Sequence, residues 1–197
     1  MARMNNDAFL KWGAVSAIVF IVLQGAVYLT GIEFRAFVPL FSLALVFRLI
    51  AALAGYELLA KTHYGLARVG LGFAFLAITM MFLEATVWGA RSASSVDEAD
   101  MVALFDSMHL MVLWFVALWV LCWGIAFVQE SGAARALGAL LIFHVFVNLL
   151  RYFTIQFEIG GIIAGIRDVI GPLTLLGTYL LLSVVLLKTS QTARDKT

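Results

Sequence analysis

Six long apolar runs occupy almost the whole of this 197-residue chain, and they limit the folds open to it more than any other feature. They cover residues 12–30, 36–60, 66–90, 101–128, 136–155 and 162–187. A helix needs about 20 predominantly apolar residues to cross a bilayer. The connections are short, which makes consecutive helices antiparallel neighbours. We therefore expect an all-α polytopic membrane protein, with six transmembrane helices in an antiparallel bundle and a single transmembrane domain over residues 1–197.

Composition agrees with this expectation. Apolar residues make up 63% of the chain and charged residues 13%, whereas a soluble domain carries about a quarter charged residues. Six crossings leave no room for a soluble catalytic domain. The net charge of +1 gives no reason to expect a nucleic-acid partner. The lipid bilayer is the partner that the composition predicts.

The distribution of lysine and arginine predicts the orientation, because cytoplasmic loops of membrane proteins are enriched in both. Most of these residues fall at the two termini and in the second and fourth connections: Arg3, Lys11, Lys61, Arg68, Arg135, Lys188, Arg194 and Lys196. The opposite connections are rich in acidic residues. We expect both termini to be cytoplasmic, in an integral protein of the bacterial cytoplasmic (inner) membrane.

Ionisable and polar residues inside the apolar runs are candidates for a binding site, because charge is costly in hydrocarbon and usually has a function there. On this topology they lie mostly toward the extracytoplasmic side. His144, Asn148 and Arg151 recur at i, i+4 and i+7, on one face of the fifth helix. We expect an outward-opening polar cavity that is lined by helices three to six. Its candidate ligand-binding residues are Glu84, Asp106, His109, His144, Asn148, Arg151, Arg167 and Asp168.

A structural role competes with this interpretation. Intramembrane charges often pair to hold a bundle together, and for any single residue that role is favoured. For the whole cluster we favour binding. Moving a charge to the bilayer centre costs about 2.5–3.5 kcal/mol on insertion scales, and packing through small residues would avoid that cost.

Two further features lie outside this candidate set. Arg48 lies near the middle of the second run and needs either a carboxylate from another helix, such as Glu84, or a water-filled cavity. Trp114, Trp119 and Trp123 of the fourth run are interpreted as lipid-facing and packing bulk.

A metal or haem is an alternative that the sequence leaves open. His109 and His144 lie on neighbouring helices, as two axial haem ligands do. With Glu84 and Asp106 they form a ligand set that suits zinc or iron. The sequence contains neither the Glu-x-x-His nor the His-Glu-x-x-His pattern, and it lacks the Gly-x-Ser-x-Gly nucleophile motif. No catalytic residue is assigned.

The segment from Gln129 to Leu141 contains Ser131-Gly132, Arg135 and Leu137-Gly138. It resembles a run that joins the fourth and fifth helices in an uncharacterised bacterial six-helix integral membrane family, a domain of unknown function. Arg68-Val69-Gly70 and the region from Asp106 to His109 are similar in placement. The resemblance covers helices three to five, implies the six-helix topology and brings no activity with it.

The leading hypothesis is a multipass protein that binds a small molecule or ion in this cavity, as a transporter or binding subunit does. The first alternative is an accessory or structural subunit whose buried charges meet other membrane subunits. The second is a haem- or metal-binding membrane redox protein.

Overall fold

The computed structural model describes residues 6–29, 34–91 and 98–194. All regular structure within these residues is helical. The elements are α1 (Asn6–Leu29), α2 (Phe34–Leu59), α3 (Tyr64–Arg91), α4 (Glu98–Val128), α5 (Gly132–Gln156) and α6 (Ile162–Arg194). All six of these helices are long and apolar enough to cross a membrane. The described residues thus confirm the all-α class and the six candidate membrane spans.

The helices extend beyond the apolar runs from which they were predicted. α1 begins at Asn6 rather than at residue 12, and α6 continues to Arg194 rather than ending at residue 187. An apolar run marks only the part of a helix that suits hydrocarbon. Polar residues at its ends continue the same backbone hydrogen bonding where their side chains reach water.

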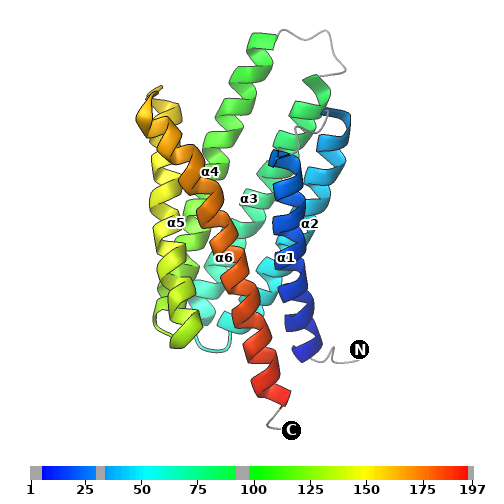
Figure 1. The fold of residues 1–197 in the computed structure, drawn as a ribbon, viewed down its shortest axis with the longest axis vertical. Coiled ribbons are helices and arrows are strands. Elements are labelled where there is room, and N and C mark those ends of the chain that lie inside the picture. Colours follow the sequence, from blue (N-terminus) through cyan, green and yellow to red (C-terminus); the bar gives the residue numbers. More distant parts are fainter. Residues whose placement is uncertain (1–5, 30–33, 92–97, 195–197) are drawn as a thin grey trace.

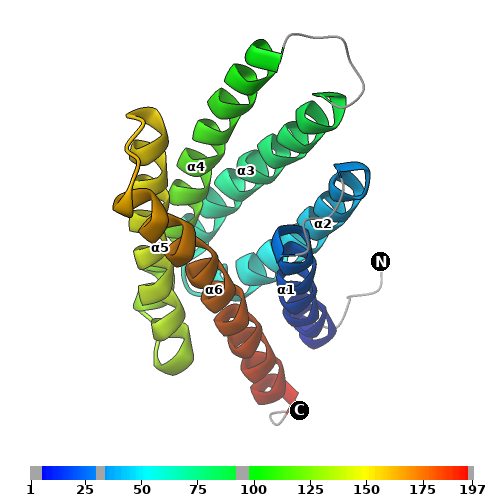
Figure 2. The same cartoon turned by 45° about the horizontal axis from the view of Figure 1, so that its top comes forward.

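The helices pack as a ring in chain order. Each helix contacts the next one in sequence, and α6 returns to pack against α1 (Figures 1 and 2). α2 also contacts α4 and α6 across the interior of the ring. α1 begins and α6 ends at the same end of the bundle (Figure 1). The side chains of α2 that face inward are therefore close to three or more other helices.

Many of the buried residues are alanines, and large apolar residues cover much of the outside. The buried alanines include Ala14, Ala17, Ala44, Ala51, Ala52, Ala54, Ala67, Ala74, Ala77 and Ala126. The exposed large side chains include Trp12, Val22, Phe146, Val169 and Leu173. Membrane helices associate through small residues because lipid tails give large apolar side chains no reason to turn inward. An apolar outer surface over small buried residues is the arrangement that lipid surroundings favour.

Glycines allow Trp123 of α4 to lie between α2 and α3. A Cβ placed on Gly55 of α2 would lie 2.6 Å from the Trp123 ring, and one on Gly70 of α3 would also clash with this ring. The indole Nε1 donates a hydrogen bond of 3.3 Å to the carbonyl oxygen of Ala67. Trp123 is therefore fixed against both helices, with its side chain 2% exposed.

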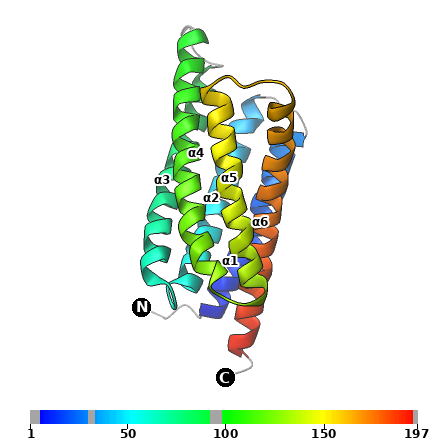
Figure 3. The same cartoon turned by 90° about the vertical axis from the view of Figure 1, so that its left-hand side faces the viewer.

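Polar side chains link α3 and α4 near both of their ends. Glu84 Oε1 lies 3.0 Å from His109 Nδ1, toward the end of α3 and the beginning of α4. At the other end, Thr62 donates a hydrogen bond of 2.9 Å to Glu130 Oε1, and His63 Nε2 lies 3.2 Å from the same oxygen. Figure 3 shows α3 and α4 side by side between these two ends.

Candidate functional site

Among the described residues the buried cation is Arg48, in the middle of α2 and 6% exposed. It faces the interior because its neighbours at i−4, i+3 and i+4 are the buried alanines Ala44, Ala51 and Ala52. Two of its N–H groups have partners among the described residues. Nε donates to Tyr179 Oη at 2.8 Å, and one terminal nitrogen donates to Met81 Sδ at 3.0 Å.

Aromatic rings surround the Arg48 guanidinium. Its central carbon lies 5.4 Å from the ring centroid of Phe20, 5.3 Å from that of Trp119 and 5.8 Å from that of Tyr179. These rings come from α1, α4 and α6. The electron-rich face of an aromatic ring attracts a cation, by about 2 kcal/mol or more where water is excluded. The rings offset part of the cost of holding this charge inside the bundle.

Arg48 has no carboxylate partner within the described part of the chain. The histidine–carboxylate contacts described there join His63 to Glu130 and His109 to Glu84, with nitrogen–oxygen distances of 3.2 and 3.0 Å. Glu84, which the sequence suggested as a partner for Arg48, is paired with His109 instead. The second possibility raised by the sequence is a water-filled cavity; beside Arg48 the structure shows a small cavity that is lined mostly by apolar and aromatic side chains.

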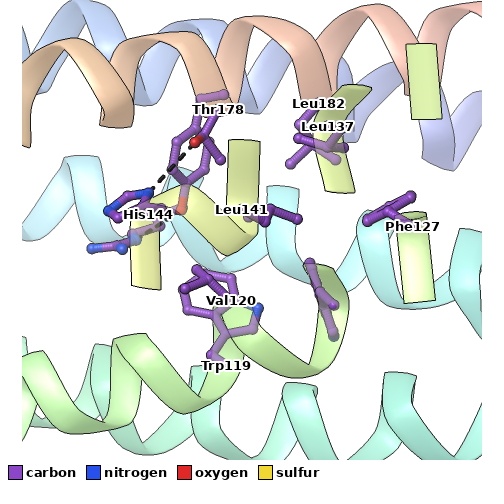
Figure 4. Close-up of a pocket in the computed structure, with 11 residues that line it drawn as sticks. Trp119, Val120, Phe127, Leu137, Leu141, His144, Thr178 and Leu182 are labelled. Atoms are coloured by element: carbon purple, nitrogen blue, oxygen red, sulfur yellow. Dashed lines mark hydrogen bonds between the residues drawn. The ribbon is translucent and has the colours of Figure 1, made fainter. Parts of the chain in front are cut away.

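This cavity has a volume of about 20 Å³. It is lined by Arg48, Trp119, Val120, Trp123, Phe127, Leu137, Leu141, His144, Thr178, Tyr179 and Leu182, which come from α2, α4, α5 and α6. In Figure 4, Trp119, His144 and Thr178 project from three helices toward the same space. A cavity needs about 10–15 Å³ to hold one water molecule, so this one is large enough for a particle of that size.

His144 lines the cavity from α5, and its hydrogen bonding assigns its neutral tautomer. Nδ1 lies 3.4 Å from Thr178 Oγ1 (Figure 4). The Thr178 hydroxyl donates its proton to the carbonyl oxygen of Thr174 at 2.8 Å. Since a hydroxyl has one proton to donate, the bond from His144 to Thr178 requires that Nδ1 carry the hydrogen. Nε2 of the neutral ring is then an acceptor.

Trp119 contributes a buried donor without a partner. Its side chain is 4% exposed and lines the cavity. Its indole Nε1 is buried and has no hydrogen-bond partner among the described residues. A buried N–H that makes no hydrogen bond loses about 1–3 kcal/mol relative to its solvated state. The Trp119 indole is thus a buried donor without an acceptor among the described residues.

The other residues proposed from the sequence differ in their burial and in their hydrogen-bond partners. Glu84 and His109 form the α3–α4 pair described above. Asp106 and Asp168 are exposed, and Arg151 is half-buried. Asn148 is buried, and its Nδ2 donates a hydrogen bond of 2.9 Å to the backbone oxygen of His144.

The cavity thus includes His144 from the predicted set and does not include Glu84, Asp106, His109, Asn148, Arg151 or Asp168. The side chain of Arg167 lies outside the described part of the chain. Sequence reasoning placed Arg48 and Trp119 outside the site. The buried alanines around Arg48 are the signal that could have placed it inside, because small residues mark the inward face of a membrane helix.

The predicted metal ligands are not assembled as a set. In residues 6–29, 34–91 and 98–194, no group of three or more histidine, cysteine, aspartate or glutamate side chains lies close enough together to hold a metal ion. Glu84 and His109 are together, whereas His144 is hydrogen-bonded to Thr178.

No protein-family model matches this chain, and neither a curated protein nor a solved structure matches it. The resemblance of the segment between the fourth and fifth helices to an uncharacterised family stays a prediction.

Proposed function

We propose that this protein is a multipass membrane protein that binds a small ion or polar molecule inside its helix bundle, as a transporter or binding subunit does. The observation that carries the proposal is the position of Arg48, a buried cation at the wall of a cavity with no carboxylate within 4 Å among the described residues. A charge in this place costs free energy, and a purely structural interior would avoid it. A ligand that accepts hydrogen bonds would take the place of the missing carboxylate partner of Arg48.

The orientation belongs to the same proposal. Consecutive helices run antiparallel across the bacterial inner membrane, with both termini in the cytoplasm, as the distribution of lysine and arginine favours. The Gln129 end of α4 then faces the cytoplasm, and the Glu158 end of α5 faces the opposite side. Both side chains are exposed.

On this orientation the ligand enters from the extracytoplasmic side. Met81, which contacts Arg48, lies three residues before Glu84 on α3. With a rise of about 1.5 Å per residue, the Glu84–His109 pair lies about one turn nearer the outer end than Arg48 does. A ligand that moves from the outer surface to the cavity would therefore pass polar side chains at this pair.

Ligand binding is tested with two variants that make the same chemical change at different places. Val120→Ile adds one methylene to the cavity wall, and Val184→Ile adds one to an exposed position on α6. Wild type and both variants are purified in mild detergent, and their melting temperatures are measured against a panel of inorganic salts and small polar molecules. We expect at least one solute to stabilise the wild type and Val184→Ile, and to leave Val120→Ile unchanged.

The proposal fails if no solute raises the melting temperature of the wild type, or if Val120→Ile responds as strongly as Val184→Ile. Orientation is tested separately. Gln129→Cys and Glu158→Cys are each placed in a Cys122→Ser background and treated with a membrane-impermeant maleimide in intact cells. Labelling of Glu158→Cys alone agrees with the proposal, and labelling of Gln129→Cys alone reverses the orientation.

A further inference from the structure

We propose that Thr62, His63 and Glu130 form a pH-sensitive clasp, which holds the connection between α2 and α3 against the connection between α4 and α5. The Thr62 hydroxyl donates a hydrogen bond of 2.9 Å to Glu130 Oε1, and His63 Nε2 lies 3.2 Å from the same oxygen. Acidification of the solution at this end of the bundle tightens the clasp, and a rise in pH loosens it. None of the three residues lines the cavity beside Arg48, so the inference is independent of the proposed ligand binding.

His63 lies at the junction between two helices. Its backbone N–H donates a hydrogen bond of 2.7 Å to the carbonyl oxygen of Leu59, the last residue of α2. Its own carbonyl oxygen accepts one of 2.9 Å from the N–H of Ala67, in the first turn of α3. A contact made by the His63 side chain therefore acts on the end of α2 and on the beginning of α3 together.

Glu130 has the corresponding position on the other side of the clasp. Its backbone N–H donates a hydrogen bond of 3.1 Å to the carbonyl oxygen of Phe127 on α4. Its carbonyl oxygen accepts one of 2.9 Å from Arg135 Nε on α5. The main chain of Glu130 is thus bonded to both α4 and α5, while its carboxylate contacts Thr62 and His63. One side-chain oxygen joins two helical hairpins.

The charge state of His63 changes the strength of this contact. An ionised carboxylate only accepts hydrogen bonds, so His63 Nε2 must carry a hydrogen to bind Glu130. Neutral histidine has that hydrogen in one of its two tautomers, whereas protonated histidine always has it and adds a positive charge. Histidine is the side chain that ordinarily changes charge between about pH 5 and 8. The clasp is therefore stronger in mildly acidic than in mildly alkaline solution.

Protons from solution can reach the clasp. Residues 60–63 and 129–131 lie between the candidate membrane spans, and the side chains of His63 and Glu130 are both partly exposed. Of the described carboxylates, that of Glu130 is the one within 4 Å of His63. On the proposed orientation this end of the bundle faces the cytoplasm, so the clasp responds to the cytoplasmic pH.

The surrounding elements carry four other charged side chains near this end of the bundle. Within the described residues they are Glu57 of α2, Lys61 of the connection, Arg68 of α3 and Arg135 of α5. Three of the four are cations, which do not compete with Glu130 for a protonated histidine. The ion pair of the clasp is therefore the one that forms when His63 takes up a proton.

The test is a double-mutant cycle measured at several pH values. His63→Gln keeps an N–H donor and cannot be protonated, and Glu130→Gln keeps the size of the side chain and removes its charge. Unfolding of the purified protein in mixed micelles of mild detergent and dodecyl sulfate gives the coupling between the two positions at about pH 6, 7 and 8. The same cycle in a His109→Gln background is the control, because His109 also contacts a carboxylate.

We expect the coupling to be larger at about pH 6 than at about pH 8 by about two- to five-fold in the unfolding equilibrium constant, the range of a partly exposed ion pair. The control background should give the same increase. Exchange of the backbone amides of residues 60–63 and 129–131 with deuterium gives a local measurement. At about pH 6 these amides should exchange faster in His63→Gln than in the wild type, and at about pH 8 equally fast.

Three results overturn the inference. A coupling of the same size at every pH would show a structural contact that does not respond to protons. An increase that disappears in the His109→Gln background would assign the response to the Glu84–His109 pair. Equal amide exchange in His63→Gln and the wild type at about pH 6 would show that protonation of His63 does not hold the two connections together. The exchange measurement decides by itself if Glu130→Gln does not fold.

Discussion

Arg48 Nε donates a hydrogen bond of 2.8 Å to Tyr179 Oη, and the two residues are 131 positions apart in the chain. The bond joins α2 to α6 across the interior of the ring. Both side chains are buried, at 6% and 4% exposure. Because hydrogen bonds to charged groups are stronger than those between neutral groups, this bond both stabilises the α2–α6 contact and orients the guanidinium at the cavity.

Replacing Tyr179 with phenylalanine should destabilise the protein. The aromatic ring stays against Phe20, whose centroid lies 4.5 Å away, so that the change removes only the hydroxyl. A buried donor that loses its partner costs about 1–3 kcal/mol, and more when it is charged. The free energy of unfolding is measured in mixed micelles of mild detergent and dodecyl sulfate. Tyr64→Phe, at an exposed ring, is the control. Equal losses for the two variants would show that the hydroxyl of Tyr179 contributes nothing.

Gly70→Ala should destabilise the protein through overpacking, because its Cβ would meet the Trp123 ring. Forcing an additional carbon into a packed interior costs about 1–3 kcal/mol. Gly72→Ala, two residues later on α3, has no heavy atom within 4 Å of the added Cβ. There alanine should be neutral or stabilising by up to about 1 kcal/mol, because it is the better helix former. The same unfolding measurement compares the two, and a larger loss for Gly72→Ala would contradict the Trp123 contact.

A double-mutant cycle should show that Glu84 and His109 stabilise the bundle as a pair. The Glu84 carboxylate is buried, and the two side chains are 3.0 Å apart. Interacting groups of this kind have coupling energies of about 0.5–3 kcal/mol. The cycle uses Glu84→Leu and His109→Leu, separately and together. A second cycle with Asp106→Leu, an exposed acid one turn from His109, should show no coupling to Glu84. Coupling of the same size in both cycles would contradict a specific pair.

The pair between His63 and Glu130 should be weaker and more sensitive to salt. Its side chains are 18% and 37% exposed, compared with 23% and 8% for His109 and Glu84. When His63 is protonated this contact is an ion pair, and exposed ion pairs contribute about 0–1 kcal/mol and are screened by salt. A cycle with His63→Ala and Glu130→Ala at low and high sodium gluconate should show a coupling that falls with salt. The Glu84–His109 coupling should change less over the same range.

The six candidate membrane spans could be predicted from the sequence because length and hydropathy are the properties that suit a helix to a bilayer. The rotation of each helix is harder to predict. In helices such as α4 the polar residues lie near one end and do not define a face along the helix, so that they do not indicate which residues point outward. Trp114 and Trp119 are five residues apart on this helix, yet one is exposed and the other lines the cavity.

The candidate site was harder still to predict, because its residues come from four helices. Arg48 and Tyr179 share no local pattern, and their bond exists only once α2 and α6 are packed. Polar residues drew attention to α3, α4 and α5, where Glu84, His109 and His144 lie. The local signal for Arg48 was weaker: alanines on either side of it, whose importance depends on the small-residue packing of membrane helices.

Removing the positive charge of Arg48 should reverse the loss of stability that Tyr179→Phe causes. Breaking one partner of a buried charged pair leaves an uncompensated group, whereas replacing both with apolar groups of similar size is often neutral or stabilising. Arg48→Met fits beside Phe20, Trp119 and Met81, because a thioether packs well against aromatic rings.

The double variant Arg48→Met/Tyr179→Phe is therefore expected to be at least as stable as the wild type, and the Arg48→Met single variant to lose less stability than Tyr179→Phe. Unfolding in mixed micelles measures all three against the wild type. A protein that gains stability by losing Arg48 keeps that residue for something other than stability, as the proposed binding site requires. If Arg48→Met is instead the least stable of the three, the guanidinium is chiefly a structural link between α2 and α6, and the free-energy cost that supports the binding proposal does not exist.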